Sequence, residues 1–497
     1  MNLAAALLAS AARDPGAPAV LAASGPITHG ELAAATAALA ARLTDPGTRV
    51  AIVAGNEPAF VVAYLATLAA GAVAVPLNPA APVPELAREL DVTRPARVLC
   101  SEAYVAHARA AVAAATIDAT VDVITPDSLD APGTLTPVSR ATDDLAALLF
   151  TAGTAGAPKA AMLTHGCLLA NLEQVQRHPG LALRADDVVL GVLPLFHVYG
   201  LNVVLGLALF AGACVSMVEH FHPRDTLRRI ASDGVTVVPA VPAIYAAWTD
   251  LSPADAPPDA FASVRRAVSG AAALDPEVAR AASARFGITV EDGYGLTEAS
   301  PVVTTAGLGD VRPGSIGPPL PGVEVRLVDV DGADVLTGDP GELWVKGPNV
   351  FAGYWEDELA TERVLTADGW LRTGDVAVAD DDGWLTLVGR AKDVIIVSGF
   401  NVHPGEVEEV LLADPDVADA AVVGEPHPRT GETVVAYVVP ASERGVDTRA
   451  LLHTASTQLA RYKLPSRVEV VASLPRNFAG KLVRRALAPD VATEKPA

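Results

Sequence analysis

"TRVAIVAGNEPAFVVAYLATLAAGAVAVPLN", from Thr48 to Asn78, contains a strand, a helix and a second strand in one run. The opening "TRVAIVAGN" predicts a buried strand, "EPAFVVAYLATLAAG" predicts an apolar helix, and "AVAVPLN" predicts another strand. Strands that alternate with helices in this way predict a parallel sheet with helices on both faces. The fold class is therefore expected to be α/β.

The same alternation continues on both sides of this run. "TRPARVLCS" and "DDLAALLFTAG" predict further strands. Thr28 and Glu31 have the spacing of a capping box at the start of an apolar-periodic helix. We therefore expect a large N-terminal domain made of parallel-type sheets sandwiched with helices.

The pattern changes in the last third of the chain. From about residue 315 short strands and turns predict a β-rich subdomain, at about 315–389. After Arg390 a compact α+β pattern follows. These changes predict an N-terminal domain over residues 1–389, a boundary at 390–392 and a small C-terminal domain over 393–497.

Composition limits the partners and the compartment. The chain has 497 residues and a formal net charge of −22, which argues against nucleic acid and anionic membranes as partners. The apolar stretches 59–77 and 201–218 reach bilayer length, but glycines and a proline divide them, so they predict buried core rather than membrane insertion. Cys100, Cys167 and Cys214 have no paired spacing, which is typical of a reduced, cytoplasmic protein.

A glycine-rich loop follows the strand "DDLAALLF". In "TAGTAGAPK" the backbone of Gly153 and Gly156, the hydroxyl of Thr154 and the charge of Lys159 are suited to phosphate groups. The loop is not a P-loop, because alanine follows the lysine in place of Ser or Thr. Taken alone, it fits a surface turn equally well.

Further motifs follow the loop. They are "EDGYGLTEASPVV" (Glu291–Val303), "DGWLRTGDVAV" (Asp368–Val378), "GRAKDVIIVSGFNVHPGEVE" (Gly389–Glu408) and "LPRNFAGKLVRRAL" (Leu474–Leu487). In order and spacing they resemble the adenylate-forming (AMP-binding) superfamily of acyl-CoA synthetases, adenylation domains and luciferases, and the last is most similar to fatty acyl-CoA ligases. The resemblance runs from about Thr28 to Leu487 and implies the fold of those enzymes, with a mobile C-terminal lid domain.

The resemblance also implies the reaction and the cofactors. A carboxylic acid and ATP, with Mg²⁺, would give an acyl adenylate and pyrophosphate, and the thiol of CoA would then take the acyl group. In-line attack on an α-phosphate needs mainly positioning and charge neutralisation from the protein.

The nucleotide site is implied residue by residue. The phosphates would lie against Thr151, Gly153, Thr154, Gly156 and Lys159. The adenine would lie along small or planar residues, namely Gly270, Ala271, Ala272, Asp292, Gly293, Tyr294 and Gly295. Asp375 would accept from both ribose hydroxyls, and Arg390 would add a donor nearby.

Catalytic roles are implied for a few polar residues. Glu298 would coordinate Mg²⁺, and Thr297 would contact the α-phosphate. Lys481 matches the adenylation lysine, which would bridge the attacking carboxylate and the α-phosphate. Lys392 matches the hinge about which the C-terminal domain pivots between the two half-reactions.

Alanine occupies three places in the phosphate loop where the family pattern has other residues. Ala152 and Ala155 stand where the family has Ser and Thr, and Ala160 stands where it has Gly. Two hydroxyl donors are thereby lost, and hydrogen bonds to charged groups contribute about 1.5–3 kcal/mol each. We expect a working loop with a looser grip on pyrophosphate.

The acceptor thiol is left open between CoA and an acyl carrier protein. A basic cluster could hold the CoA phosphates, dock an acidic carrier protein or form a solvated face; it comprises Arg461, Lys463, Arg467, Arg476, Lys481, Arg484 and Arg485. The segment around Gly399 resembles the part that shapes a pantetheine tunnel, which both acceptors need. A third hypothesis is a nucleotide- or acyl-binding protein without catalysis, but Glu298, Asp375 and Lys481 are all present.

The acid substrate is predicted from two apolar segments. "PLFHVYGLN" (Pro194–Asn202) and "VTVVPAVPAIYAAW" (Val235–Trp248) resemble stretches that line the acyl pocket, with His197 and Tyr199 facing it; a core histidine is the equally weighted alternative for His197. A second charge on the acid would need a buried partner, and none is evident. We expect a medium- or long-chain fatty acid or an aryl acid, and a monomer or homodimer.

Overall fold

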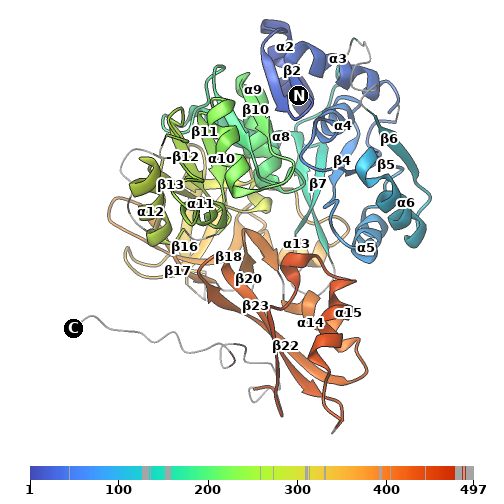
Figure 1. Cartoon of the computed structure of the whole chain (residues 1–497), viewed down its shortest axis with the longest axis vertical. Helices are drawn as coiled ribbons and strands as arrows, with labels where there is room; N and C mark the ends of the chain where they lie inside the picture. Colours follow the sequence, from blue (N-terminus) through green and yellow to red (C-terminus); the bar gives the residue numbers. More distant parts are fainter. Residues whose placement is uncertain are drawn as a thin grey trace.

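The computed structural model describes the chain except residues 44, 126–133, 135, 152–157, 258, 273, 308–311, 313, 330–331, 391–394, 403, 443, 476–483, 485–486 and 488–497. Its strands form a six-stranded sheet, an eight-stranded sheet and two smaller sheets (Figure 1). Helices pack around the two large sheets, and the C-terminal sheet lies below them in this view. The expected α/β fold class is confirmed.

The six-stranded sheet contains the run that opens the sequence analysis. Its strands, in spatial order, are β6 (Thr120–Ile124), β5 (Arg97–Ser101), β3 (Arg49–Val53), β4 (Val73–Pro76), β7 (Leu145–Thr151) and β8 (Lys159–Thr164). Helix α4 (Pro58–Ala69) connects β3 to β4, and these two strands pair in parallel. Only β8 is antiparallel to its neighbour, and Thr151 pairs with Lys159 across the ends of the phosphate loop. The predicted strand–helix–strand unit is confirmed.

The eight-stranded sheet forms the other half of the large domain. Its strands, in spatial order, are β14 (Val302–Thr305), β13 (Val290–Gly295), β12 (Arg266–Ser269), β11 (Val237–Ala240), β9 (Val188–Gly191), β10 (Cys214–Met217), β1 (Pro18–Ala22) and β2 (Gly25–Thr28). The inner strands are parallel, and the two edge strands β14 and β2 are antiparallel to their neighbours. Parallel strands that are buried on both faces carry nearly continuous apolar residues, as these do.

Helices cover the large sheets. Those of the N-terminal part are α1 (Leu3–Leu7), α2 (Ala9–Arg13), α3 (His29–Ala40), α5 (Val83–Thr93), α6 (Val105–Ala114), α8 (His165–Arg177), α9 (Leu207–Ala211), α10 (Pro223–Ser232), α11 (Pro242–Thr249), α12 (Pro276–Phe286) and the π-helix η2 (Tyr199–Gly206). The predicted capping box of α3 is confirmed, because Thr28 N donates to Glu31 Oε2 at 2.8 Å and Glu31 N donates to Thr28 Oγ1 at 3.2 Å.

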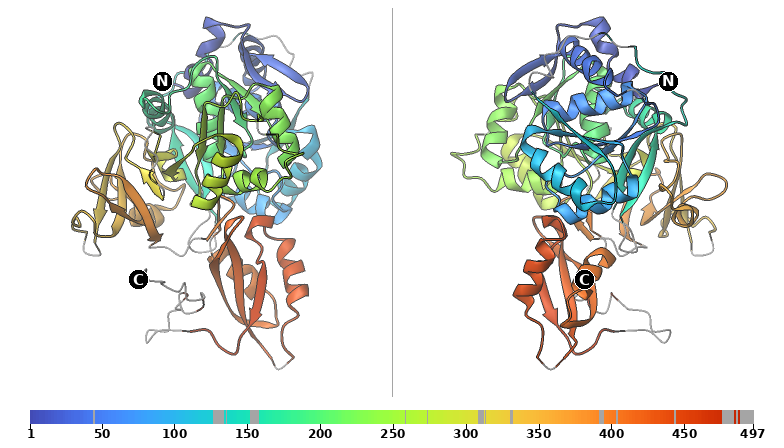
Figure 2. Two further views of the ribbon diagram at one scale, coloured as in Figure 1. Left: turned by 60° about the vertical axis from the view of Figure 1, so that its left-hand side comes forward. Right: turned by 90° about the vertical axis from the view of Figure 1, so that its right-hand side faces the viewer.

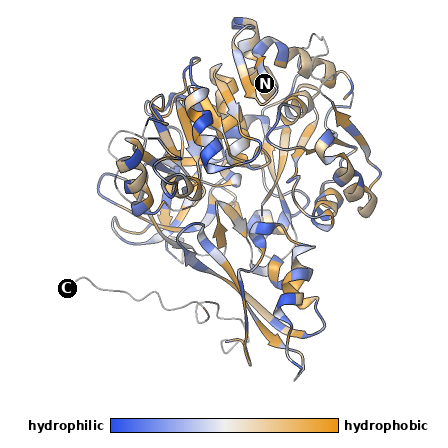
Figure 3. Cartoon of the chain, viewed as in Figure 1, coloured by the Kyte–Doolittle hydropathy of each residue, from blue (hydrophilic) through white to orange (hydrophobic). Residues whose placement is uncertain are grey.

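The two long apolar stretches are core elements. Residues 59–77 form α4 and β4, and residues 201–218 lie in η2, α9 and β10. Nearly every side chain of α4 is buried. Among the described residues, no helix has both the length and the apolarity needed to cross a membrane. Figure 3 shows the apolar residues concentrated in the strands at the centre of the molecule.

The predicted β-rich subdomain is a five-stranded antiparallel sheet. Its strands, in spatial order, are β15 (Ser315–Gly317), β19 (Leu385–Arg390), β18 (Leu371–Ala379), β17 (Gly341–Lys346) and β16 (Glu324–Val328), and α13 (Glu358–Val364) precedes β18. Asp375 of β18 pairs with Arg390 of β19 in the backbone register. The "TGD" motif and the end of the large domain are therefore neighbours.

The C-terminal residues form an α+β unit with its own core. Its elements are β20 (Ile395–Val397), β21 (Phe400–Val402), α14 (Pro404–Leu412), β22 (Val417–His427), β23 (Gly431–Pro440), α15 (Thr448–Ser456) and β24 (Arg467–Val470). Val402, Val407, Val422 and Leu451 are among the residues buried in that core. Figure 2 shows this unit as a body below the large domain. The boundary at 390–392 remains a prediction, because Lys392 lies outside the described residues.

Candidate active site

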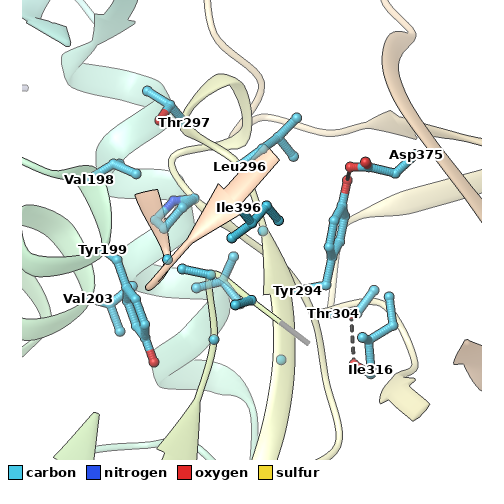
Figure 4. A pocket seen from close by; sticks show the side chains of 18 of the residues that line it. Val198, Tyr199, Val203, Tyr294, Leu296, Thr297, Thr304, Ile316, Asp375 and Ile396 are labelled. Atoms are coloured by element: carbon cyan, nitrogen blue, oxygen red, sulfur yellow. Dashed lines mark hydrogen bonds between the residues drawn. The ribbon is translucent and has the colours of Figure 1, made fainter. Parts of the chain in front are cut away.

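A cavity of about 800 Å³ is lined by residues of the large domain and of the C-terminal domain (Figure 4). Many predicted site residues are on its wall, namely Thr151, Lys159, His197, Gly270, Ala271, Ala272, Asp292, Gly293, Tyr294, Gly295, Thr297, Glu298, Asp375 and Gly399. They come from separate strands and loops, so the sheets bring together what the sequence separates.

Tyr294 and Asp375 join the "YGLTE" and "TGD" motifs. Tyr294 ends β13, Asp375 lies in β18, and the tyrosine hydroxyl donates to Asp375 Oδ2 at 2.6 Å (Figure 4). Asp375 N in turn donates to Thr373 Oγ1 at 3.1 Å. The carboxylate is thereby held at the cavity wall, where it can accept hydrogen bonds from hydroxyl groups.

Tyr354 contacts both Glu298 and Lys159. The sequence motifs did not indicate Tyr354 as a site residue. The Tyr354 hydroxyl donates to Glu298 Oε1 at 2.6 Å, and Lys159 Nζ lies 5.3 Å from the centre of the Tyr354 ring. Burial, together with the neighbouring Glu298, raises the pKa of Tyr354, so its hydroxyl stays a donor. The backbone bridge between Ala161 and Tyr354 explains the proximity, since it aligns residue 354 with β8.

The segment from Gly270 to Ala272 lies close to Tyr199 on the cavity wall. Ala271 has a φ of 66°, and a Cβ on Gly270 would lie 3.2 Å from the Tyr199 ring. The Tyr199 ring would have to shift slightly to admit a Cβ at 270, so glycine permits the close approach that the sequence predicts. Beside it, burial raises the pKa of Asp292 to about 7.

His197 faces both the cavity and the C-terminal domain. Its ring packs edge-on against Phe400, with ring centres 6.3 Å apart, and its Nδ1 accepts from Tyr199 N at 3.3 Å. Burial lowers the pKa of His197 to about 4, so the imidazole is neutral near pH 7. His197 also lines a second cavity of about 70 Å³. It is a wall residue of the pocket rather than a residue of the closed core.

Gly399 brings the C-terminal domain to the cavity. It has a φ of 87°, and a Cβ there would lie 2.8 Å from Val241 Cγ1 and 3.3 Å from Ala271 Cβ. Both the backbone conformation and the close contact therefore favour glycine. The turn between β20 and β21 therefore lies directly against Ala271.

Several predicted site residues lie outside the described residues. They are Gly153, Thr154, Gly156, Lys392 and Lys481, together with the loop alanines Ala152 and Ala155. Arg390 is described through its backbone, which pairs with Asp375. Ala160 is buried in β8, and its carbonyl accepts from Trp355 N at 2.8 Å.

Several side chains of the basic cluster form ion pairs within the chain. Lys463 Nζ lies 2.6 Å from Glu85 Oε1 and 2.8 Å from Glu406 Oε1. Arg467 pairs with Glu425 at 2.7 Å, and Arg484 pairs with Glu408 at 2.8 Å. These three cations are each paired with a carboxylate of the chain, which reduces the positive charge that they offer to CoA phosphates or to a carrier protein.

A charged side chain lies on the cavity wall, although no buried partner for a second charge on the acid was evident from the sequence. Arg266 lines the cavity with a side chain that is 12% exposed, and its Nε lies 3.5 Å from Glu291 Oε2. The alternation of side chains along β12 places residues 266 and 268 on one face. The sequence indicates this alternation, but it does not show that the face with residues 266 and 268 borders the cavity.

Comparison with known proteins agrees with the geometry. A family model described as AMP-binding enzyme matches residues 7–355, and one described as AMP-binding enzyme C-terminal domain matches residues 406–481. Feruloyl-CoA synthase from Amycolatopsis sp is 38% identical over 467 residues, 92% of each chain. Long-chain-fatty-acid–CoA ligase from Escherichia coli O6:H1 is 38% identical over 355 residues, 69% of this chain and 61% of that one.

A solved structure shares the architecture. Malonyl-CoA ligase, in a ternary product complex with methylmalonyl-CoA and AMP bound, has a TM-score of 0.82 and 35% identity, covering 92% of this chain and 96% of that chain. The fold and the cavity define an acid–thiol ligase of the AMP-forming type. The chain belongs to the AMP-binding enzyme family.

Proposed function

We propose that this enzyme activates a carboxylic acid as its acyl adenylate with ATP, releases pyrophosphate, and transfers the acyl group to the thiol of CoA. The observation that carries the proposal is the cavity itself. Residues of the phosphate loop ends, the "YGLTE" motif, the "TGD" motif and the "VSGFN" turn all line it. A site for a nucleotide, an acyl group and a thiol needs these groups in one place.

The described residues support specific roles in holding ATP. Asp375 is fixed by Tyr294 and would accept from the ribose hydroxyls, while the Tyr294 ring would stack on adenine. Lys159 and Thr297 would contact the phosphates as charge and hydroxyl donor. Preorganised donors of this kind stabilise the charge that develops at the α-phosphate.

The residues fit a magnesium ion that is held mostly by phosphate oxygens. Glu298 lines the cavity, and Tyr354 binds one of its carboxylate oxygens, which leaves the other for a cation. Within the described residues there is no cluster of three side chains able to ligate a metal, and Mg²⁺ commonly takes one or two carboxylates plus substrate phosphates. When bound, the ion would neutralise phosphate charge; Glu298 would orient it.

Two half-reactions need two arrangements of the C-terminal domain. Lys481 would donate to the attacking carboxylate and the α-phosphate during adenylation, with Lys392 as the pivot. In the arrangement described here, Gly399 lies against Val241 and Ala271, where its missing side chain would leave a path for a thiol. The thiol sulfur would then attack the acyl carbonyl and displace AMP.

The acyl part of the cavity supports an acid with an apolar body. Val189, Val203, Val237, Val268 and Ile316 line it. The similar proteins are a feruloyl-CoA synthase and a long-chain-fatty-acid–CoA ligase, so both aryl and fatty acids are in the proposed class. Cys100, Cys167 and Cys214 are free and buried, which supports a reducing compartment such as the cytoplasm.

Mass spectrometry of reactions with ATP, Mg²⁺ and a panel of carboxylic acids, each with and without CoA, tests the proposal. We expect acyl adenylate without CoA and acyl-CoA plus AMP with CoA for at least one acid class. If acyl adenylate accumulates and CoA does not consume it, the acceptor of the acyl group is a carrier protein. Absence of both products across aryl and fatty acids would contradict the proposed function.

A further inference from the structure

Ionisable side chains of both domains meet at the second, smaller cavity. Glu85 and Glu89 belong to helix α5 of the large domain. Glu406 belongs to α14 of the C-terminal domain, and Lys463 ends its 3₁₀ turn η4 (Arg461–Lys463). All four side chains line the cavity of about 70 Å³. The contact between the domains therefore brings three carboxyl groups and one ammonium group together.

Two of the three carboxyl groups have partners that suit a carboxylate. Glu85 Oε1 lies 2.6 Å from Lys463 Nζ, and Glu85 Oε2 accepts from Ala460 N at 2.9 Å. Glu406 Oε1 lies 2.8 Å from the same ammonium. One cation is thus shared by two carboxylates, so a third negative charge beside them is unfavourable.

Glu89 is the third carboxyl group. It is 8% exposed, and within the described part of the chain no hydrogen bond reaches its Oε2. A carboxylate here would be desolvated without compensation, whereas a neutral carboxylic acid costs far less to bury. Burial and the neighbouring Glu85 raise the pKa of Glu89 to about 8. The cluster therefore holds a proton near neutral pH, and Glu89 is where it fits.

The groups that face Glu89 come from α5, α14, η4 and the far wall of the small cavity; they are Glu85, Arg88, Glu406, Tyr462, Lys463 and His197. Burial raises the pKa of Tyr462 and lowers that of His197 to about 4, so both are neutral near pH 7. Arg88 and Lys463 favour the ionised form of Glu89, and Glu406 opposes it. Three of these groups, at positions 406, 462 and 463, belong to the C-terminal domain and would leave when it pivots away.

We propose that a proton on Glu89 positions the C-terminal domain for the thiol step: the domain takes up one proton from solvent when it closes against α5 and releases it when it pivots away. The proton forms an O–H bond with the Glu89 carboxylate in the closed arrangement. With the domain turned away, Glu89 faces water and is ionised. The inference rests on the ligase function proposed above, because that function needs the domain in two arrangements.

The direction of the pH dependence follows from the two states of Glu89. A carboxyl group in water has a pKa of about 4.3, so between that pH and about pH 8 the closed arrangement binds one proton more than the open one. Closure should weaken about tenfold per pH unit in this window and level off above it. The thiolate fraction of CoA rises over the same range and acts in the opposite direction.

Acyl-CoA formation from pre-made acyl adenylate tests the inference at pH 6, 7, 8 and 9. Glu89→Gln is neutral at every pH, and the ratio of wild-type to variant rate cancels the ionisation of CoA. We expect this ratio to fall about 10-fold or more from pH 6 to pH 8 and then to stay level, whereas the same ratio for ATP–pyrophosphate exchange should not fall. Glu409→Gln, at an exposed glutamate of α14, is the control and should follow the wild type.

A distance measurement reports the domain arrangement without turnover. Spin labels are placed at two exposed positions, one in each domain, through Glu102→Cys and Asp416→Cys; the three native cysteines are buried. Double electron–electron resonance should show the closed distance losing population from pH 6 to pH 8. The same labels in the Glu89→Gln background should show no such loss.

The outcomes separate this inference from the ligase function. A closed population that does not change with pH would overturn the inference, and so would a pH dependence that persists in Glu89→Gln. Equal falls in both half-reactions would also overturn it, because they would indicate a loss of folded enzyme rather than of positioning. No adenylate and no acyl-CoA with any acid would contradict the ligase function, and the distance measurement would still decide whether Glu89 controls closure.

Discussion

Lys463 Nζ lies 2.6 Å from Glu85 Oε1, which makes a buried ion pair between the C-terminal domain and helix α5 of the large domain. The same ammonium lies 2.8 Å from Glu406 Oε1, and Ala460 N donates to Glu85 Oε2 at 2.9 Å. Phe400 stacks on Tyr462 with ring centres 4.2 Å apart. These contacts hold the domain in the arrangement that places Gly399 at the cavity.

Lys463→Met should weaken that arrangement. It leaves Glu85 and Glu406 buried without their cation, and removing one partner of a buried pair costs about 3–5 kcal/mol. We expect a lower Tm in thermal unfolding followed by calorimetry. Arg461→Met changes an exposed cation nearby and should leave Tm within about 1 °C. An unchanged Tm in Lys463→Met would show that the pair does not hold the domains.

The wild type should lose folding stability as the pH rises to alkaline values, and Glu89→Gln should remove this loss. Burial and the neighbouring Glu85 raise the pKa of Glu89 to about 8, far above its usual value. A carboxyl whose pKa is raised on folding stabilises the protein most at low pH, and this contribution disappears as pH rises through the folded pKa. Between pH 6 and pH 9 the wild type should lose on the order of 2 kcal/mol from this group, and the glutamine variant should not.

Thermal unfolding at pH 6 and pH 9 measures this difference. The fall in Tm between the two pH values should be smaller in Glu89→Gln than in the wild type. Glu102→Gln, at an exposed glutamate, serves as the control and should leave the fall unchanged. Parallel falls in all three proteins would mean that Glu89 is ionised at both pH values.

Gly399→Leu should impair thioester formation more than adenylation. A side chain at 399 would run into Val241 and Ala271, at the place where we propose the thiol enters. Misplacement by about 1 Å near the reacting groups costs on the order of 100-fold in rate. Acyl-CoA formation from pre-made acyl adenylate should fall by that order, while ATP–pyrophosphate exchange should fall less than about threefold.

Gly383→Leu is the control that distinguishes backbone strain from blockage of the proposed thiol path. Gly383 also has a positive φ, 79°, but no atom lies within 4 Å of where its Cβ would be. It should lose stability and keep both half-reactions. Equal losses in both half-reactions for Gly399→Leu would remove the proposed thiol path.

Tyr354→Phe should raise the Mg²⁺ concentration needed for adenylation. The hydroxyl holds Glu298 Oε1 at 2.6 Å, and a hydrogen bond to a charged group contributes about 1.5–3 kcal/mol. We expect the exchange rate at limiting Mg²⁺ to fall about 10-fold or more, with partial recovery at high Mg²⁺. Tyr437→Phe, which removes a hydroxyl that donates to Leu487 O, is the matched control. An unchanged Mg²⁺ dependence would show that Tyr354 does not position Glu298.

Local sequence patterns predicted the fold well where a local signal exists. The β3–α4–β4 unit and the Thr28 capping box depend on residues close in sequence, so periodicity and spacing were enough. The family resemblance placed Tyr294 and Asp375 at one nucleotide site, but it did not predict the hydrogen bond between these residues, which are 81 positions apart.

Tertiary contacts explain what the sequence could not indicate. Tyr354 reaches Glu298 because its segment bridges to β8, and nothing near residue 354 signals that bridge. Lys463 looked like one of several surface cations, but its partner Glu85 is 378 positions away. Arg266 is on the pocket wall because β12 faces inward there, which depends on the whole sheet.

The most direct test of the central claim follows the oxygen atoms of the substrate. A carboxylic acid that the enzyme turns over, labelled with ¹⁸O in both carboxylate oxygens, is incubated with ATP, Mg²⁺ and CoA, and the products are analysed by mass spectrometry. Attack on the α-phosphate moves one labelled oxygen into AMP when the thiol displaces it, so the predicted result is AMP with one ¹⁸O and acyl-CoA with the other. Label in inorganic phosphate with ADP as co-product, or unlabelled AMP, would contradict an acyl-adenylate mechanism.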